Sequence, residues 1–99
     1  MNRHVVVDVE TTGLSSVHDR VIEIGAVLLV GGEIVAEYGT LIEVDAPIHW
    51  AAQRVHGISR EMLRGRPAPE TVWPAFAGFV GESILVGHNV RFDLDFIRR

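Results

Sequence analysis

Residues 5–14 read Val-Val-Val-Asp-Val-Glu-Thr-Thr-Gly-Leu, an apolar stretch that carries two carboxylates and then runs into a polar turn containing glycine. Successive side chains of a β-strand point to opposite faces, so Asp8 and Glu10 project together from one face while Val7 and Val9 fill the other. The stretch therefore predicts a buried strand that presents a pair of acidic side chains near its end.

This acidic pair is typical of a metal site. Two carboxylates on one edge repel each other and lose hydration beside an apolar core, and a divalent cation relieves both costs. A simpler interpretation is that Asp8 and Glu10 are charges that keep the end of a strand soluble. That interpretation accounts neither for the polar turn nor for a second acidic motif near the C-terminus.

The first half of the chain predicts an antiparallel meander of three strands. Strands are expected over residues 4–9, 20–30 and 34–44, all rich in β-branched and aliphatic residues. The pair Gly31-Gly32 between the second and third strands is typical of a two-residue hairpin turn.

The second half predicts helices and one more strand. Short helices are expected over 50–55, ended by Gly57, and from a Ser59 cap to residue 63. A longer helix is predicted to begin at a Thr71 cap, with Pro74 in its first turn, and to end at Gly81. A buried strand over 84–86 and a last helix from about residue 91 complete a mixed α/β sheet with flanking helices.

The composition limits the kind of protein. The chain has 99 residues, 47% of them hydrophobic, and a mean hydropathy of +0.23, which favours an extensive interface or, our preferred interpretation, a piece of a larger fold. It has no cysteine, no signal-peptide pattern and no apolar run long enough to cross a membrane, so we expect a cytoplasmic protein.

The net charge of −4, with arginine as the only fully charged basic residue, argues against a broad basic face for nucleic acid. That argument weakens if the acidic residues hold cations, because bound divalent ions would add positive charge beside them.

A second motif, His88-Asn89-Val90-Arg91-Phe92-Asp93, follows the predicted strand over 84–86. It places Asp93 in the first turn of a helix at the carboxyl end of a strand, where ligand sites of α/β sheets gather. Together with residues 8–14 and the segments 20–26 and 55–58, it resembles the DEDD superfamily (DEDDh type) of 3′-to-5′ exonucleases, in particular the proofreading (epsilon) subunits of bacterial DNA polymerase III. Both motifs in this order are a far more specific signal than a lone Asp-x-Glu.

The resemblance implies a ribonuclease H-like fold and hydrolysis of phosphodiester bonds at nucleic-acid 3′ ends. It implies that Asp8, Glu10 and Asp93 ligate two Mg²⁺ or Mn²⁺ ions, which fits the preference of these ions for oxygen ligands. Taken alone, Asp93 is more typical of a structural helix-dipole partner than of a metal ligand.

The resemblance also implies contacts to the substrate. The candidate substrate-binding residues are Thr11, Thr12, Gly13, Leu14, His56, Asn89 and Phe92. For His56 a structural role is about as well favoured, and Asn89 is also typical of a residue that shapes a loop through hydrogen bonds. The implied partners are a single-stranded or frayed 3′ end, DNA in preference to RNA, and a DNA polymerase catalytic subunit in proofreading or repair.

The family's third motif, a histidine followed five residues later by an aspartate, lies well beyond the second motif, and no such pair follows Asp93 in these 99 residues. We therefore expect residues 1–99 to be the N-terminal part of a single exonuclease domain, incomplete at the C-terminus and with little activity alone. The alternative is a non-catalytic fragment or interaction module that retains metal affinity. Apolar surface left by an incomplete sheet would favour a homodimer.

Several other residues have two interpretations. The aromatic residues Trp50, Trp73, Phe76 and Phe79 are expected mostly in the core, with base stacking as the alternative for any that is exposed. Glu23 faces either the neighbour of its strand or the rim of the acidic site. His4, His18 and His49 follow no pattern and are expected at the surface or partly packed.

Overall fold

The computed structural model describes residues 2–15 and 17–87. Their centre is a four-stranded sheet of order β3-β2-β1-β4, made of β1 (Arg3–Thr11), β2 (Val21–Val30), β3 (Glu33–Leu41) and β4 (Ile84–Gly87). Neighbouring strands are antiparallel except that β4 runs parallel to β1. The predicted meander with a parallel fourth strand is therefore confirmed. The predicted last helix lies outside the described residues.

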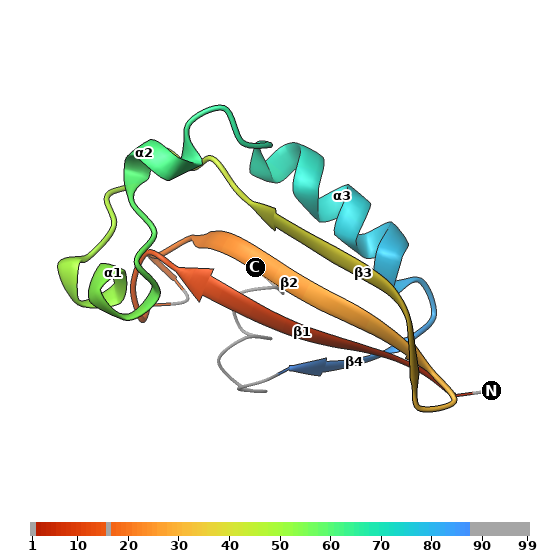
Figure 1. Ribbon diagram of the computed structural model, residues 1–99. Coiled ribbons are helices and arrows are strands. Elements are labelled where there is room, and N and C mark those ends of the chain that lie inside the picture. The colour runs from red at the N-terminus through yellow and green to blue at the C-terminus, as the bar shows by residue number, and fades with distance from the viewer. Residues whose placement is uncertain (1, 16, 88–99) are drawn as a thin grey trace.

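Side-chain alternation along β1 separates two faces of the sheet. Val5, Val7 and Val9 are buried on one face, whereas Asp8 is exposed and Glu10 half-buried on the other. The buried face packs against α3 (Pro69–Val80), which lies along the sheet in Figure 1. The face that carries the carboxylates points away from this helix, as the alternation predicts.

The β2–β3 hairpin turns at Gly31 and Gly32, whose φ angles of 61° and 84° favour glycine over other residues. β3 ends at Leu41, three residues before the predicted end. The prediction was wrong here because the chain leaves the regular ladder. The backbone N–H of Ile42 still donates to the Ile22 carbonyl, but that of Glu43 donates to the Pro67 carbonyl instead.

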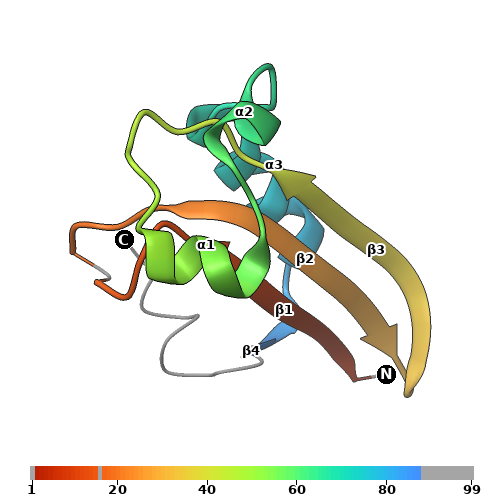
Figure 2. The same cartoon turned by 60° about the vertical axis from the view of Figure 1, so that its left-hand side comes forward.

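Two short helices lie at the carboxyl end of β1, as Figure 2 shows. They are α1 (Trp50–His56), which ends at Gly57 in the left-handed conformation, and α2 (Arg60–Leu63), which Ser59 caps. Both helices were predicted within a residue of their bounds. A small apolar cluster of Ile22, Ile58 and Leu63 fixes this part of the chain to the end of the sheet.

The start of α3 differs from the prediction. Ala68 is the N-cap and Pro69 the first helical residue, so Thr71 and Pro74 both lie inside the helix. Proline fits the first position because its fixed φ suits a helix and the missing N–H has no intrahelical partner there. Pro74 lacks an N–H and cannot donate the usual helical bond to the carbonyl of Glu70.

The main core joins the sheet to α3. Its buried members are mostly aliphatic side chains of β1 and β2, together with Val72 and Phe76 of the helix. Tyr38 of β3 packs its ring near that of Phe76, with centroids 6.1 Å apart. Within residues 2–15 and 17–87, no helix combines the length and the apolar character that crossing a bilayer requires.

Candidate active site

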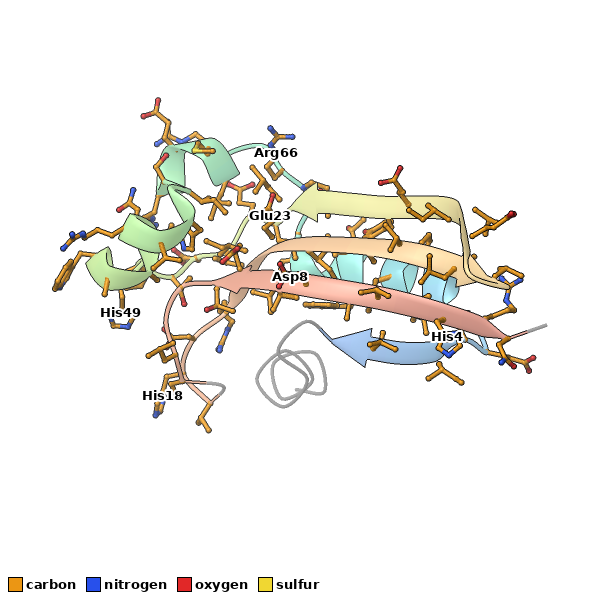
Figure 3. The ribbon with its side chains drawn as sticks, turned by 60° about the horizontal axis from the view of Figure 1, so that its bottom comes forward. His4, Asp8, His18, Glu23, His49 and Arg66 are labelled. Carbon is orange, nitrogen blue, oxygen red and sulfur yellow. The ribbon has the colours of Figure 1, made fainter. Side chains whose placement is uncertain are left out.

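The acidic face of the sheet is open around Asp8. Asp8 pairs with Gly25 on β2, and Gly25 pairs with Gly39 on β3, so two positions next to Asp8 carry no side chain. A Cβ added at Gly25 would meet no atom within 4 Å. Figure 3 shows Asp8 on β1, beside β2. The geometry leaves room for a ligand beside this carboxylate.

Glu10 lies opposite a third carboxylate, that of Glu23 on β2. Because paired residues of an antiparallel ladder share a face, Asp8, Glu10 and Glu23 all lie on the side away from α3. Glu23 therefore lies on the acidic face, at the rim of the acidic site, which is one of its two predicted positions. Figure 3 labels both Asp8 and Glu23.

The oxygen donors of this face fit Mg²⁺ or Mn²⁺, which prefer carboxylates. In the described part of the chain, however, no group of three histidine, aspartate or glutamate side chains is arranged to hold an ion. Asp8 and Glu10 supply two donors of the predicted set. The third predicted ligand, Asp93, and the predicted substrate residues Asn89 and Phe92 lie outside the described residues.

A β-bulge lies at the end of the acidic pair. Glu10 pairs with Glu23 and Thr11 with Val21, so Ile22 is an extra residue on β2. Bulges increase the local twist and redirect side chains, and they are common beside active sites. Here the bulge lets both Val21 and Ile22 be buried, in the main core and the small cluster respectively.

The turn after β1 is held by Asp19, a residue that sequence reasoning missed. The Thr12 hydroxyl donates to Asp19 Oδ1 over 2.9 Å, and the Ser15 backbone N–H donates to Oδ2, also over 2.9 Å. Thr12 Oγ1 in turn accepts from the Arg20 backbone N–H over 2.9 Å. Asp19 is only 6% exposed. Its carboxylate thus closes the turn onto the start of β2.

His49 connects this turn to α1. Its Nε2 lies 3.3 Å from Asp19 Oδ1, and its backbone N–H donates to the Thr12 carbonyl over 2.9 Å. The His49 side chain is 65% exposed, which agrees with the predicted surface position. The prediction assigned it no partner, because residues that meet across a turn and a distant loop leave no periodic signal.

The surroundings of Asp19 favour its charged form. Burial by itself raises the pKa of this carboxyl, but the hydrogen bonds from Ser15 and Thr12 and the nearby His49 and His18 together lower the pKa below its ordinary value. Asp19 is therefore charged near neutral pH and provides a fixed negative charge inside the turn.

His56 fastens the end of α1 to the end of β1. Its Nδ1 accepts a hydrogen bond of 2.9 Å from the Ile58 backbone N–H. Nε2 must then carry the proton, and it donates to the Thr11 carbonyl over 3.0 Å. Both ring nitrogens are engaged within the protein, which supports the structural interpretation of His56. The predicted contact of His56 with substrate stays a prediction.

Between the turn and α1 lies a cavity of about 560 Å³. Its lining includes Glu10 and Thr11 from β1, Leu14 from the turn, and Trp50 and Val55 from α1. Thr11, Thr12 and Gly13 are buried, whereas Leu14 is 87% exposed. The structure therefore brings four of the predicted substrate residues, Thr11, Gly13, Leu14 and His56, to the lining of one cavity.

Trp50 was expected in the core and is not there. It is 71% exposed, and it lines the cavity from the first position of α1. Phe76 is buried, and Trp73 and Phe79 are partly buried against the core, as predicted.

Comparison with known proteins identifies relatives of the whole chain. The sequence model of the family described as Exonuclease (RNase_T) matches residues 5–99. The PolC-type DNA polymerase III of Clostridium perfringens is 43% identical over 98 residues, 99% of this chain and 7% of that protein. The corresponding protein of Thermotoga maritima is 48% identical over 94 residues, 95% of this chain and 7% of that protein.

Solved structures agree on the fold. Escherichia coli exonuclease I in complex with a dT13 oligonucleotide superposes with a TM-score of 0.89 at 19% identity, over 99% of this chain and 23% of that one. The ribonuclease H-like fold that the resemblance implied is thereby confirmed. The chain spans only a small part of the length of these relatives. With most of its length matched by the family model, the chain belongs to the DEDD-type exonuclease family.

Proposed function

We propose that residues 1–99 form the N-terminal part of a single exonuclease domain that removes nucleotides from nucleic-acid 3′ ends. The observation that carries this proposal is the position of Glu10. It shares the open face of β1 with Asp8, and it also lines the cavity between the turn and α1. One side chain therefore joins a candidate metal site to a candidate nucleotide site.

Asp8 and Glu10 would hold divalent ions, with Asp93 as a third ligand. When bound, two Mg²⁺ or Mn²⁺ ions supply activation of water and stabilisation of the leaving 3′-oxygen. The carboxylates fix where these charges lie, and their own negative charge is neutralised on binding. Glu23, opposite Glu10, adds negative charge to the same face and would strengthen its attraction for cations.

The cavity would receive the terminal nucleotide. Thr11, Gly13 and Leu14 line it, and His56 and Asp19 hold this turn in place through the bonds described above. A pre-formed turn places the scissile phosphate without a cost of ordering at the moment of binding. Asn89 and Phe92 of the second motif are proposed as further substrate contacts.

We propose a single-stranded or frayed DNA end as substrate, in proofreading or repair. The support is the likeness to PolC-type DNA polymerase III, a DNA polymerase by name. A polymerase catalytic subunit or region is then the natural partner, and the cytoplasm, where bacteria copy DNA, the natural location. Exonuclease I, the structural neighbour, is described in complex with oligonucleotides.

A general base is the remaining requirement. His88 is the last histidine in the sequence, and no histidine follows the second motif within these 99 residues. A positioned base contributes roughly 10²–10⁴-fold to such a reaction. We therefore propose that a polypeptide of only these residues turns over DNA far more slowly than a longer form that adds a histidine and an aspartate.

Digestion of a 5′-labelled single-stranded oligonucleotide in Mn²⁺ tests this function. A longer form should release mononucleotides from the 3′ end, and Asp8→Asn should abolish the release. The 99-residue polypeptide should be slower by about 10²-fold or more. Equal rates for the two forms would contradict the role of the missing base, and an inactive longer form would contradict the proposed function.

Metal binding, measured together with DNA cleavage, distinguishes the enzyme from the alternative, a non-catalytic module that keeps its metal affinity. Calorimetric titration of the 99-residue polypeptide with Mn²⁺ should show binding that Glu10→Gln weakens. Glu37→Gln is the matched control, since Glu37 lies on the same face but pairs with the neutral Val27. A longer form that binds Mn²⁺ with the same dependence on Glu10 and does not cleave DNA would favour the module.

A homodimer is a further proposal. Ile84 and Val86 of β4 are 58% and 36% exposed, and both pair with β1 residues of the acidic face. Apolar side chains at the edge of a sheet favour association. Size-exclusion chromatography with mass detection should find a dimer, and a monomer at high concentration would contradict it.

A further inference from the structure

Trp50 is exposed where a buried side chain is expected. It is 71% exposed, and two other apolar residues of the cavity lining, Leu14 and Val55, are 87% and 84% exposed. Three large apolar side chains around one cavity form an exposed apolar patch, which typically marks a binding site. The cavity volume of about 560 Å³ also lies in the range of small-ligand sites.

Arg54 adds a positive charge to this patch. It is four residues after Trp50, so the two side chains share one side of α1. The guanidinium carbon lies 5.7 Å from the centroid of the Trp50 ring, a cation–π distance. The indole is thus accompanied by a cation and still keeps most of its surface open to solvent.

These features together indicate which class of ligand the cavity binds. An apolar peptide would fit Leu14, Trp50 and Val55 but would leave Arg54 unmatched. A nucleotide offers a flat base for the indole and an anionic phosphate for the guanidinium. The carboxylates of the proposed metal site adjoin the cavity through Glu10, so a base held here belongs to the nucleic acid being processed.

We propose that Trp50 is a stacking platform for a base of the unpaired 3′ end, with Arg54 binding the backbone phosphate beside it. This inference rests on the proposed function and extends it with a specificity. Because both faces of a base inside a duplex are covered by its neighbours, such a base cannot also stack on Trp50, so the platform favours single-stranded ends. Because every base has a flat face, the platform does not select among sequences.

The two tryptophans of the chain allow a direct test. Trp73 of α3 packs edge-on against Phe76, with ring centroids 6.2 Å apart, and lies outside the cavity lining. Trp73→Phe therefore leaves Trp50 as the sole indole, and Trp50→Phe leaves Trp73. We expect a short oligothymidylate to quench the fluorescence of Trp73→Phe and to leave that of Trp50→Phe unchanged. If Trp73→Phe does not fold, the unaltered chain is used instead. Oligothymidylate should then quench only the part of the fluorescence that comes from Trp50.

Affinity gives a second measurement, by anisotropy of a labelled oligothymidylate in Mn²⁺ before any product forms. Trp50→Leu should raise Kd about 5- to 150-fold, the range expected for losing one base–aromatic stack. Trp50→Phe should raise Kd only about threefold, because a smaller ring still stacks. Circular dichroism checks that each variant folds.

Arg54→Gln tests the phosphate contact. It should weaken binding and reduce the salt dependence of Kd by about one phosphate contact. Arg64→Gln, which removes the same charge from the C-cap of α2, a helix that contributes no residue to the cavity lining, should change neither.

The outcomes separate this inference from the proposed function. Binding of oligothymidylate with no quenching of Trp50, or with equal Kd for Trp50→Leu and the unaltered chain, would overturn the platform and leave the exonuclease proposal standing. Preferred binding of a blunt duplex would overturn the platform as well. Absence of any oligonucleotide binding, in the 99-residue chain and in a longer form alike, would contradict both proposals.

Discussion

Glu10 and Glu23 face each other directly across the antiparallel ladder of β1 and β2. Like charges in this arrangement repel each other, and a bound cation would relieve that repulsion. The charges that would attract cations to the acidic face therefore also repel each other within the sheet.

The first prediction concerns this pair. Glu23→Gln should raise the free energy of unfolding by about 0.2–1 kcal/mol without metal, because it removes the repulsion of Glu10. In saturating Mn²⁺ the increase in unfolding free energy should be smaller. Urea unfolding of both chains, without and with Mn²⁺, measures the two increases. Glu37→Gln, opposite the neutral Val27, should show neither effect, and a loss of stability in metal-free Glu23→Gln would refute the prediction.

The second prediction concerns Asp19. Thr12 and Ser15 donate to different oxygens of its carboxylate, so the amide of Asp19→Asn sets an N–H group against one of these donors. We expect a loss of about 1–3 kcal/mol in unfolding free energy. Asp45→Asn is the matched control, since Asp45 is fully exposed and pairs with Arg60 only at 3.7 Å. Equal effects of the two changes would show that Asp19 does not hold the turn.

The pH dependence of stability follows from the same carboxylate. Its pKa in the folded protein lies below the ordinary value, despite burial, because Ser15, Thr12, His49 and His18 favour the anion. A lowered pKa gives stability that is present above the unfolded-state pKa of about 3.9 and is lost as the pH falls through the folded-state pKa. As the pH falls below about 4, the stability difference between the unaltered chain and Asp19→Asn should thus shrink. A difference that grows as the pH falls through this acid range would contradict the prediction.

A fourth prediction tests the close packing at Gly13. A Cβ at this position would lie 2.5 Å from both Asp19 Oδ2 and His49 Cδ2, so Gly13→Ala must displace the carboxylate or the imidazole. We expect a loss of about 1–3 kcal/mol in unfolding free energy, together with weaker nucleotide binding. Gly78→Ala in α3, with no atom near the added Cβ, should be neutral or stabilising. Thermal unfolding of both variants measures these changes. An unchanged stability of Gly13→Ala would show that the turn accommodates the added Cβ at little cost.

The strands and short helices could be predicted because their signals are local. Alternation in residues 5–10 identified the buried and acidic faces, and the glycines at 31 and 57 marked a turn and a helix end. The errors occurred where two local signals compete. Pro69 and Pro74 can each occupy a first turn, and the sequence does not say that the earlier one begins the helix.

The candidate site could be predicted only in part, because much of it depends on tertiary contacts. Asp8 and Glu10 lie in one strand, so their common face follows from periodicity. Asp19, His49 and Thr12 meet across a turn and a distant loop. The one available clue was an aspartate immediately before a buried strand, next to a polar turn that needs hydrogen-bond partners. The exposure of Trp50 left no clue, since tryptophan is usually packed.

The pairing of β4 with β1 also bears on the order in which the strands pair during folding. The ladders of β1 with β2 and of β2 with β3 join neighbours in the chain, whereas β4 reaches β1 only after α1, α2 and α3 have intervened. Pairings between distant segments close large loops and are expected to form late. The acidic pair of β1 would therefore be in place within the meander before β4 completes the sheet.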